Sequence, residues 1–164
     1  MICWIDTALL DEVSAEARHS LRGRKNRNFH GDDAQPGHRL LNAIEPGSYI
    51  MPHRHLDPNK GETMVVLRGT LGLVSFDDAG KVIETARVSH GVPGGNPRGS
   101  TPLGMDIPSG IWHTVFALEP GTVFLEAKAG PYLPLTAEEK APWAPAEGDP
   151  AAPAYLTGLV RLLA

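Results

Sequence analysis

The chain has 164 residues, 41 % of them hydrophobic and 21 % charged, a composition typical of one globular domain with an apolar core. Its net charge of −4 argues against the basic surface that nucleic acids and anionic membranes require. The single cysteine, Cys3, excludes an intramolecular disulfide and a four-cysteine zinc site.

The first segment lacks the basic start of a signal peptide, and no apolar run approaches the roughly 20 residues that span a bilayer, so we expect a cytoplasmic protein. Residues 7–21 predict an amphipathic helix, because apolar residues recur at spacings of three and four and Gly23 supplies a stop. These apolar residues are Leu10, Val13, Ala17 and Leu21. The basic residues of the segment 18–27 are interpreted as cations that favour the negative end of the helix dipole.

Short strand-like segments follow, separated by turns rich in Gly and Pro. They cover residues 38–45, 48–55, 62–69, 70–78, 81–89, 105–119 and 122–130. Many short strands without alternating helices indicate an all-β sandwich or barrel. Residues 90–104 hold five Gly and three Pro, which predicts a long loop that could act as a lid.

The organisation that we expect is a single domain in three parts. A helical lead-in spans residues 1–23, a β-barrel spans 24–130, and a Pro-rich extension spans 131–164 and packs on the same domain. The extension is expected to end in a short helix at residues 154–163, where a helical pattern returns.

Two histidines, His53 and His55, are separated by one residue on the predicted strand 48–55. Successive side chains on a strand point to opposite faces, so these two share a face with Cα atoms about 6.5 Å apart, close enough to converge on one metal ion. The turn that follows brings Glu62 to the start of the next strand, where its carboxylate can serve as a third ligand. The alternative is a pair of surface histidines, because so short a pattern also arises by chance.

A fourth candidate ligand, His113, is distant in sequence and lies on a strand that follows a turn. One face of this strand is formed by Ile111, His113, Val115 and Ala117, and the other by Trp112, Thr114, Phe116 and Leu118. If the first face points into the barrel, the imidazole lies in an apolar interior and needs a partner there. The second face is too apolar to be bare, so we expect the N-terminal helix, the Pro-rich extension or a second subunit to cover it.

The spacing of Gly47, His53, His55, Glu62 and Gly69 resembles the first sequence motif of the cupins. Residues 104–113 resemble the second motif, with Pro108, Gly110 and His113 in the expected order. The gap between His55 and Glu62 is longer than in the common pattern. More narrowly, residues 24–30, 38–55, 106–118, 126–132 and 141–149 are similar to the WbuC-type cupin metalloproteins.

This resemblance implies a jelly-roll β-barrel that holds one divalent transition metal ion (Fe, Mn, Ni, Co or Zn). The implied ligands are His53, His55, Glu62 and His113. The WbuC-type proteins are associated with surface-polysaccharide gene clusters, and the resemblance implies no established reaction.

Further polar residues are candidates for binding a substrate. Arg24, Asn26, Asn28 and His30 alternate, so an extended strand would place all four on one face, towards a ligand rich in hydroxyl or phosphate groups. The alternative is a solvated edge strand. Arg39 and Tyr49 lie on strands that lead to the histidine motif, and arginine is suited to bidentate recognition of carboxylate or phosphate.

These features predict a metal-dependent enzyme acting on a small polar molecule, such as a sugar or sugar nucleotide, with the catalytic residues unassigned. The alternatives are an Fe(II)-dependent dioxygenase, a non-catalytic metal- or sugar-binding cupin, and a metal-free sugar epimerase. The sequence points to a small-molecule ligand and to neither nucleic acid nor membrane. The apolar strand faces and the Pro-rich extension further suggest a homodimer.

Overall fold

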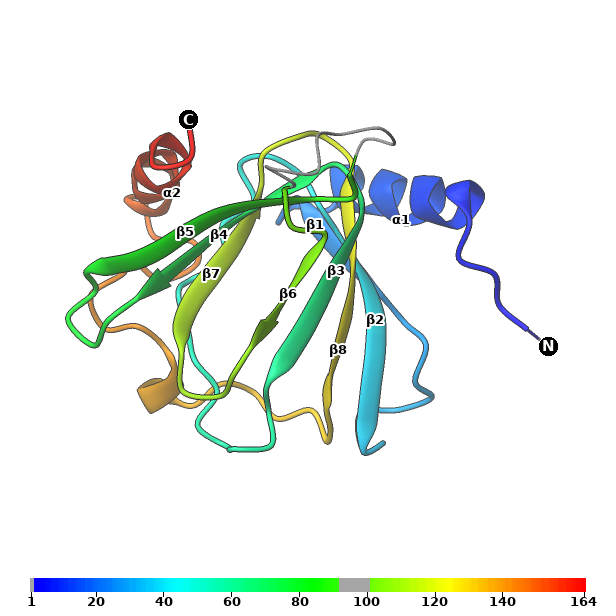
Figure 1. The fold of residues 1–164 in the computed structure, drawn as a ribbon, viewed down its shortest axis with the longest axis horizontal. Helices are drawn as coiled ribbons and strands as arrows, with labels where there is room; N and C mark the ends of the chain where they lie inside the picture. The colour runs from blue at the N-terminus through cyan, green and yellow to red at the C-terminus, as the bar shows by residue number, and fades with distance from the viewer. Residues whose placement is uncertain (1, 92–100) are drawn as a thin grey trace.

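The computed structural model describes residues 2–91 and 101–164 (Figure 1). The first half contains α1 (Thr7–His19), β1 (Arg24–Asn28), β2 (Gly37–Ile44), β3 (Glu62–Arg68), β4 (Thr70–Phe76) and β5 (Val82–Ser89). The second contains β6 (Gly104–Ile107), β7 (Trp112–Ala117), β8 (Thr122–Ala129), the 3₁₀ turn η1 (Ala137–Glu139) and α2 (Ala152–Arg161). The predicted all-β fold, compatible with a jelly roll and with a helix near each end, is confirmed.

The strands form two antiparallel sheets that pack face to face. One sheet has the order β1-β2-β8-β3-β6, and the other has the order β5-β4-β7. Apolar side chains from both sheets fill the space between them, including Met64 and Phe124 from the first sheet and Leu71 and Val115 from the second. Alternation along each strand leaves a second apolar set on the outer face of each sheet, and these outer faces need their own cover.

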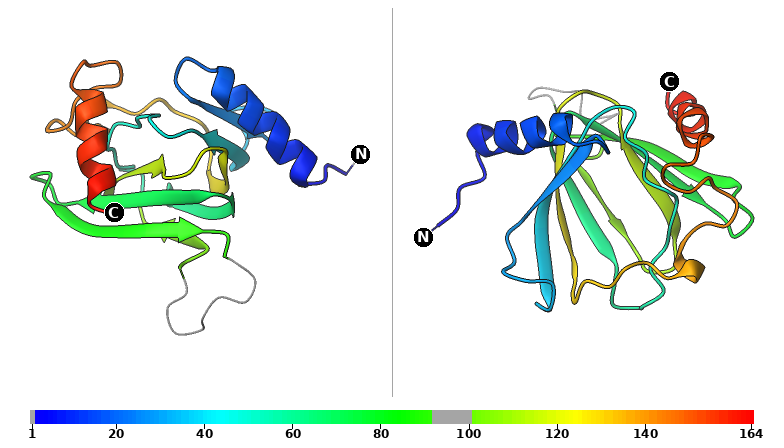
Figure 2. Two further views of the ribbon diagram at one scale, coloured as in Figure 1. Left: turned by 90° about the horizontal axis from the view of Figure 1, so that it is seen from above. Right: turned by 180° about the vertical axis from the view of Figure 1, so that it is seen from behind.

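Helix α1 covers the outer face of the five-stranded sheet (Figures 1 and 2). The Asp6 side chain caps its start by accepting a hydrogen bond from the Leu9 amide at 3.0 Å. Its apolar face, centred on Val13 and Ala17, packs on Leu41 and Val123. The helix predicted over 7–21 is therefore confirmed, although it ends at residue 19.

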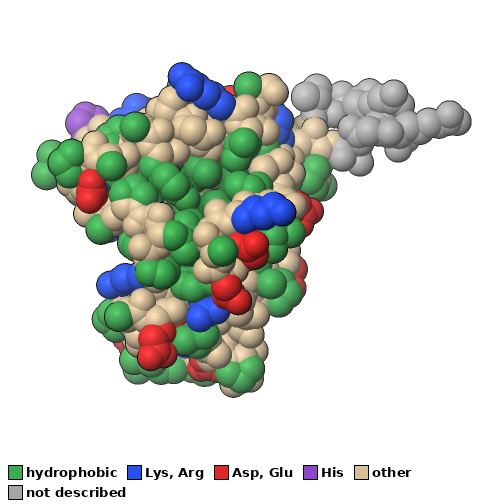
Figure 3. All heavy atoms as spheres, turned by 90° about the vertical axis from the view of Figure 1, so that its left-hand side faces the viewer, with side chains coloured by type: hydrophobic (Ala, Val, Ile, Leu, Met, Phe, Trp, Pro, Cys, Tyr) green, Lys and Arg blue, Asp and Glu red, His purple; other side chains and the backbone are tan. Residues whose placement is uncertain are grey.

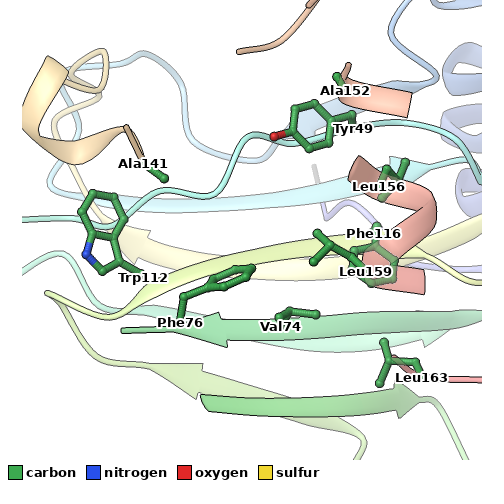
Figure 4. Packing of buried hydrophobic residues seen from close by; sticks show 10 residues of the cluster. All are labelled: Tyr49, Val74, Phe76, Trp112, Phe116, Ala141, Ala152, Leu156, Leu159 and Leu163. Atoms are coloured by element: carbon green, nitrogen blue, oxygen red, sulfur yellow. The ribbon is translucent and has the colours of Figure 1, made fainter. Parts of the chain in front are cut away.

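The outer face of the three-stranded sheet is covered by the C-terminal extension (Figure 4). Phe76, Trp112 and Phe116 of this face pack against α2 and the segment before it, which contributes Leu156, Leu159 and Ala141. Three covers were considered for the face of Trp112 and Phe116. In the structure this face is covered by the Pro-rich extension. Inward-facing His113 and Val115 occupy the opposite side of β7, as predicted.

Replacement of Leu156 by alanine tests this cover. Leu156 is 5 % exposed on α2, so the cavity left by Leu156→Ala is expected to lower the free energy of unfolding by about 2–5 kcal/mol. The control variant Leu21→Ala removes a fully exposed leucine, and it is expected to change that free energy by less than about 0.5 kcal/mol. Urea unfolding measures both. Equal losses would show that α2 does not seal the sheet.

The segment 48–55, predicted to be a strand, lies instead outside the named strands. It is held extended by isolated bridges: His53 exchanges backbone hydrogen bonds with His113 at 2.9 and 3.0 Å, and the Ala141 amide donates to the Pro52 carbonyl at 3.0 Å. Pro52 has no amide hydrogen to donate to a ladder, which limits regular pairing here. The predicted lid falls mainly on residues 92–100, which lie outside the described residues.

The described helices lack the length and hydropathy needed to cross a membrane. The space-filling view towards α2 and the β4–β5 turn shows hydrophobic side chains grouped on this side of the molecule (Figure 3). On β5, Ile83 is 68 % exposed, and Leu162 follows α2 with 50 % of its surface exposed.

Candidate metal centre and adjoining cavities

Three side chains from two parts of the chain converge at one end of the sandwich, the lower end in Figure 1. His53 and His55 come from the extended segment before β3, and Glu62 is the first residue of β3. One ligand atom from each lies within 4.8 Å of the other two, a grouping that could hold a metal ion. The long turn between His55 and Glu62 does not prevent this convergence.

The fourth predicted ligand, His113, lies against the same carboxylate. Its Nε2 is 3.3 Å from Glu62 Oε2, while His55 Nε2 is 3.0 Å from Glu62 Oε1. The rings of His53 and His113 have centroids 4.7 Å apart, because the backbone bridge places the two residues side by side. The structure thus brings all four predicted ligands together, although His113 is not among the three whose ligand atoms are mutually closest.

The backbone orients two of these imidazoles. Nδ1 of His53 is 3.1 Å from the Met51 carbonyl, and Nδ1 of His113 is 2.9 Å from the Ile111 carbonyl. A proton on each Nδ1 satisfies these carbonyls and makes Nε2 the atom that would bind a metal; in the metal-free protein Nε2 of His113 donates to Glu62 Oε2, and it would give up that proton when a metal binds. This is the arrangement by which proteins fix the tautomer of a metal-binding histidine. Three imidazoles and one carboxylate form a donor set that suits Mn, Fe, Co, Ni or Zn, so the residues present fit the implied metal.

The electrostatics of the site favour the protonation states that bind metal. Burial and, after it, the neighbouring His113 lower the pKa of His53 to about 4, so the imidazole is neutral at neutral pH. Burial alone would raise the pKa of Glu62, but the hydrogen bonds from His113 and His55 and the charge of Lys128 outweigh it and hold that pKa below its usual range. Glu62 is therefore a carboxylate, 3 % exposed.

The lowered pKa of His53 predicts a loss of stability in acid for the metal-free protein. The unfolded imidazole has a pKa near 6.5 and the folded one near 4, so between these values the unfolded state binds the extra proton and the folded state loses stability as the pH falls. The expected loss at pH 4.5, relative to pH 7.5, is about 2–3 kcal/mol from this residue. Urea unfolding of chelator-treated protein should show this loss in the wild type and not in His53→Gln. If the free energy of unfolding of the two proteins falls in parallel as the pH is lowered, the prediction is wrong.

A partly buried cation, Lys128, contacts two buried carboxylates beside the metal candidates. Lys128 Nζ donates to Glu62 Oε1 at 3.0 Å and lies 2.5 Å from Glu126 Oε1, and Asn42 Nδ2 donates to Glu126 Oε2 at 2.6 Å. No local sequence pattern predicts the contact between Lys128 and Glu62, which depends on the β3–β8 register that places Glu62 opposite Lys128. Burial raises the pKa of Glu126, although the charge of Lys128 acts to lower it. The pKa of Glu62, by contrast, is lowered overall.

Two cavities adjoin these residues. The larger, of about 550 Å³, is lined by His53, His55, Lys128 and Arg24 among others, and a second of about 370 Å³ lies along the inner side of β1 and β2. Of the predicted substrate-binding residues, Asn26, Asn28 and His30 line the second cavity, and Arg24 lines the first.

The remaining two predicted binding residues do not join these cavities. Arg39 alternates with buried His38 and Leu40 on β2, so it lies on the other face and is exposed. Tyr49 is packed in the apolar cluster beneath α2, and its hydroxyl donates to the Pro145 carbonyl at 2.8 Å. The sequence missed His38 and Asn42, which line the second cavity; polar residues four apart on an otherwise apolar strand were the available signal.

Comparison with known proteins gives a family match and several similar folds. Residues 5–88 match the family model described as a domain of unknown function, DUF6016. A search of the curated proteins finds no match.

Three solved structures illustrate the similar folds. KdgF from Halomonas sp. is 16 % identical, with a TM-score of 0.47 over 65 % of this chain and 80 % of that one. A cupin-2 domain containing protein from Shewanella frigidimarina is 18 % identical, with a TM-score of 0.45 over 64 % and 79 %. Oxalate decarboxylase from Bacillus subtilis is 17 % identical, with a TM-score of 0.46 over 71 % of this chain but only 26 % of that one. The DUF6016 match spans more than half of the sequence, and the chain therefore belongs to the DUF6016 family.

Proposed function

We propose that this protein is a metal-binding cupin of the WbuC type that holds one divalent transition metal ion through His53, His55, Glu62 and His113. The observation that carries the proposal is the convergence of His53, His55 and Glu62, whose ligand atoms lie within 4.8 Å of one another. Buried carboxylates and imidazoles are costly unless they are paired or coordinate an ion, and here they gather at the end of a large cavity.

The proposed activity is that of a metal-dependent enzyme on a small polar molecule, such as a sugar or sugar nucleotide in surface-polysaccharide metabolism. The metal would supply Lewis-acid polarisation of a substrate oxygen. The protein's own residues would orient the substrate: Arg24 and Lys128 line the cavity, and His53 and His113 are held by backbone carbonyls. The volume of about 550 Å³ falls in the range of small-molecule sites.

The test is elemental analysis of the untagged protein, followed by reconstitution with Fe, Mn, Co, Ni and Zn and a screen for turnover. About one equivalent of metal, with turnover of a sugar or sugar nucleotide that disappears on chelation, is the expected result. Oxygen consumption driven by substrate in the iron form would identify a dioxygenase instead. Tight binding without product at any metal loading would identify a non-catalytic cupin, and full turnover without metal would exclude the proposal.

A homodimer is proposed as the assembly. The hydrophobic side chains grouped on the side of α2 and β5, where Ile83 and Leu162 are exposed, support it (Figure 3). Light scattering is expected to give twice the monomer mass, and the monomer mass at all concentrations would refute the proposal.

A further inference from the structure

The inner face of the five-stranded sheet changes character from one edge to the other. On β3 and β6 the inward side chains, such as Met64, Val66 and Ile107, belong to the apolar core between the sheets. Along β1, β2 and the end of β8 the cavity of about 370 Å³ is lined instead mostly by polar side chains. These include Asn26, Asn28, His30, His38, Asn42 and Glu126. Packing alone would favour apolar residues on this half of the face as well.

The floor of this cavity is built from buried groups. His38 is 4 % exposed and His30 is 7 % exposed, and their rings stack with centroids 4.0 Å apart and planes 10° from parallel. Nε2 of His38 is buried and has no hydrogen-bond partner in the described parts of the chain. This nitrogen packs against Gly130 and is closed to the cavity, so the lining groups that a ligand can reach for hydrogen bonding are the side chains of β1, where Asn26 and Asn28 are exposed.

The charges around the cavity decide which chemistry it suits. Lys128 is the one lysine or arginine among the described lining residues, and it is already paired with Glu62 and Glu126. Asp33 adds a further negative charge. A phosphate would therefore meet no uncompensated cation and two acidic side chains. Hydroxyl groups both donate and accept hydrogen bonds, which matches the amides of Asn28 and Asn42 and the imidazoles.

The cavity also adjoins the one at the metal centre. His38, Lys128 and Tyr132 line both this cavity and the larger one that contains His53 and His55. A molecule that occupies both would place one end at the metal candidates and the other on the stacked histidines.

We propose that the polar cavity of β1, β2 and β8 is a subsite for a neutral, hydroxyl-rich moiety, with Asn28 as a specificity-determining residue. The link to the reaction rests on the proposed function, whereas binding in the cavity does not require the metal. The subsite accepts an uncharged sugar ring and rejects a phosphate group.

The experiment measures binding of glucose, galactose, mannose and N-acetylglucosamine by ligand-detected NMR and calorimetry, with inorganic phosphate as the anionic probe. Metal-loaded and chelator-treated protein are compared. At least one sugar is expected to bind both forms, and phosphate is expected to bind at least about tenfold more weakly.

Two variants assign that binding to the cavity. Asn28→Leu removes an exposed amide from the cavity wall, so it is expected to weaken sugar binding by about tenfold or more without lowering the melting temperature. Asn26→Leu, on the same face of β1, is expected to weaken sugar binding as well. The matched control Arg27→Leu changes the opposite face of β1, where Arg27 pairs with Glu12 of α1 at 3.0 Å, and it should bind sugar as the wild type does.

The outcomes separate this inference from the proposed function. Failure of all four sugars to bind, tighter binding of phosphate, or unchanged sugar binding in both Asn28→Leu and Asn26→Leu would overturn the subsite, even if the protein contains one equivalent of metal. Sugar binding that depends on Asn28 in a protein that takes up no metal would support the subsite and overturn the metal centre.

Discussion

The double variant His53→Ala/His113→Ala is expected to contain almost no metal, whereas the wild type contains about one equivalent. The two imidazoles are neighbours across a backbone bridge, and each has its Nδ1 held by a carbonyl at 3.1 or 2.9 Å. Loss of a group that merely orients a ligand lowers metal affinity by about 10–100-fold, so removal of two direct ligands should cost more than about 100-fold. Elemental analysis and competition with a chromogenic chelator measure the change.

A matched control uses the histidines outside the site. His19 lies at the end of α1 and His90 follows β5, and both are exposed. His19→Ala/His90→Ala removes the same number of imidazoles and is expected to keep the full metal content. If both double variants lose metal equally, or if the wild type refuses all five metals on reconstitution, the metal centre is wrong.

The variant Lys128→Met is expected to lower the free energy of unfolding of the metal-free protein by about 3–5 kcal/mol. Lys128 is the cation that contacts both Glu62 and Glu126, which are 3 % and 6 % exposed. Without it Glu62 keeps its histidine contacts, but Glu126 keeps only the amide of Asn42. A buried carboxylate with so little compensation is strongly destabilising.

A second substitution distinguishes lost charge balance from lost packing. Glu62 and Glu126 are the two carboxylates that lose their cation in Lys128→Met. Glu126→Gln in that background removes one of these two charges and is expected to restore more than half of the lost stability. Lys81→Met, on an exposed turn, should change the free energy of unfolding by less than about 0.5 kcal/mol. Chemical denaturation of all four proteins at pH 7.5 is the measurement. If the double variant is no more stable than Lys128→Met, charge balance is not the role of this lysine.

Much of the fold follows from local patterns. The spacing of Leu10, Val13 and Ala17 predicted α1, and the alternation around His113 predicted which residues of β7 share a face. The segment 48–55 is a case that local patterns do not determine. It has the composition of a strand, but its pairing is decided by His113 on one side and by the backbone near Lys140 on the other. Those partners are distant in sequence, so no local pattern could reveal that only isolated bridges form.

The candidate site divides in a similar way. The identities and spacing of His53, His55, Glu62 and His113 suggested a donor set, and the structure brings the four together. Arg39 shows the opposite case: alternation alone places it opposite His38, yet does not say which of the two faces inward. That choice is made by α1, which covers the outer face of β2 at Leu41 and Ala43 and so turns His38 and Asn42 towards the cavity.

The sequence by itself determined the strand-rich fold, the helix at each end and the residue types of a metal site, because hydrophobic period and turn residues act over a few positions. Only the tertiary structure decided the partners of those residues. Strand register placed Lys128 opposite Glu62 and His38 opposite Lys128, and packing of the C-terminal extension sealed the face of Trp112 and Phe116. Register and packing depend on free energy gained between segments far apart in the chain, which no short stretch of sequence contains.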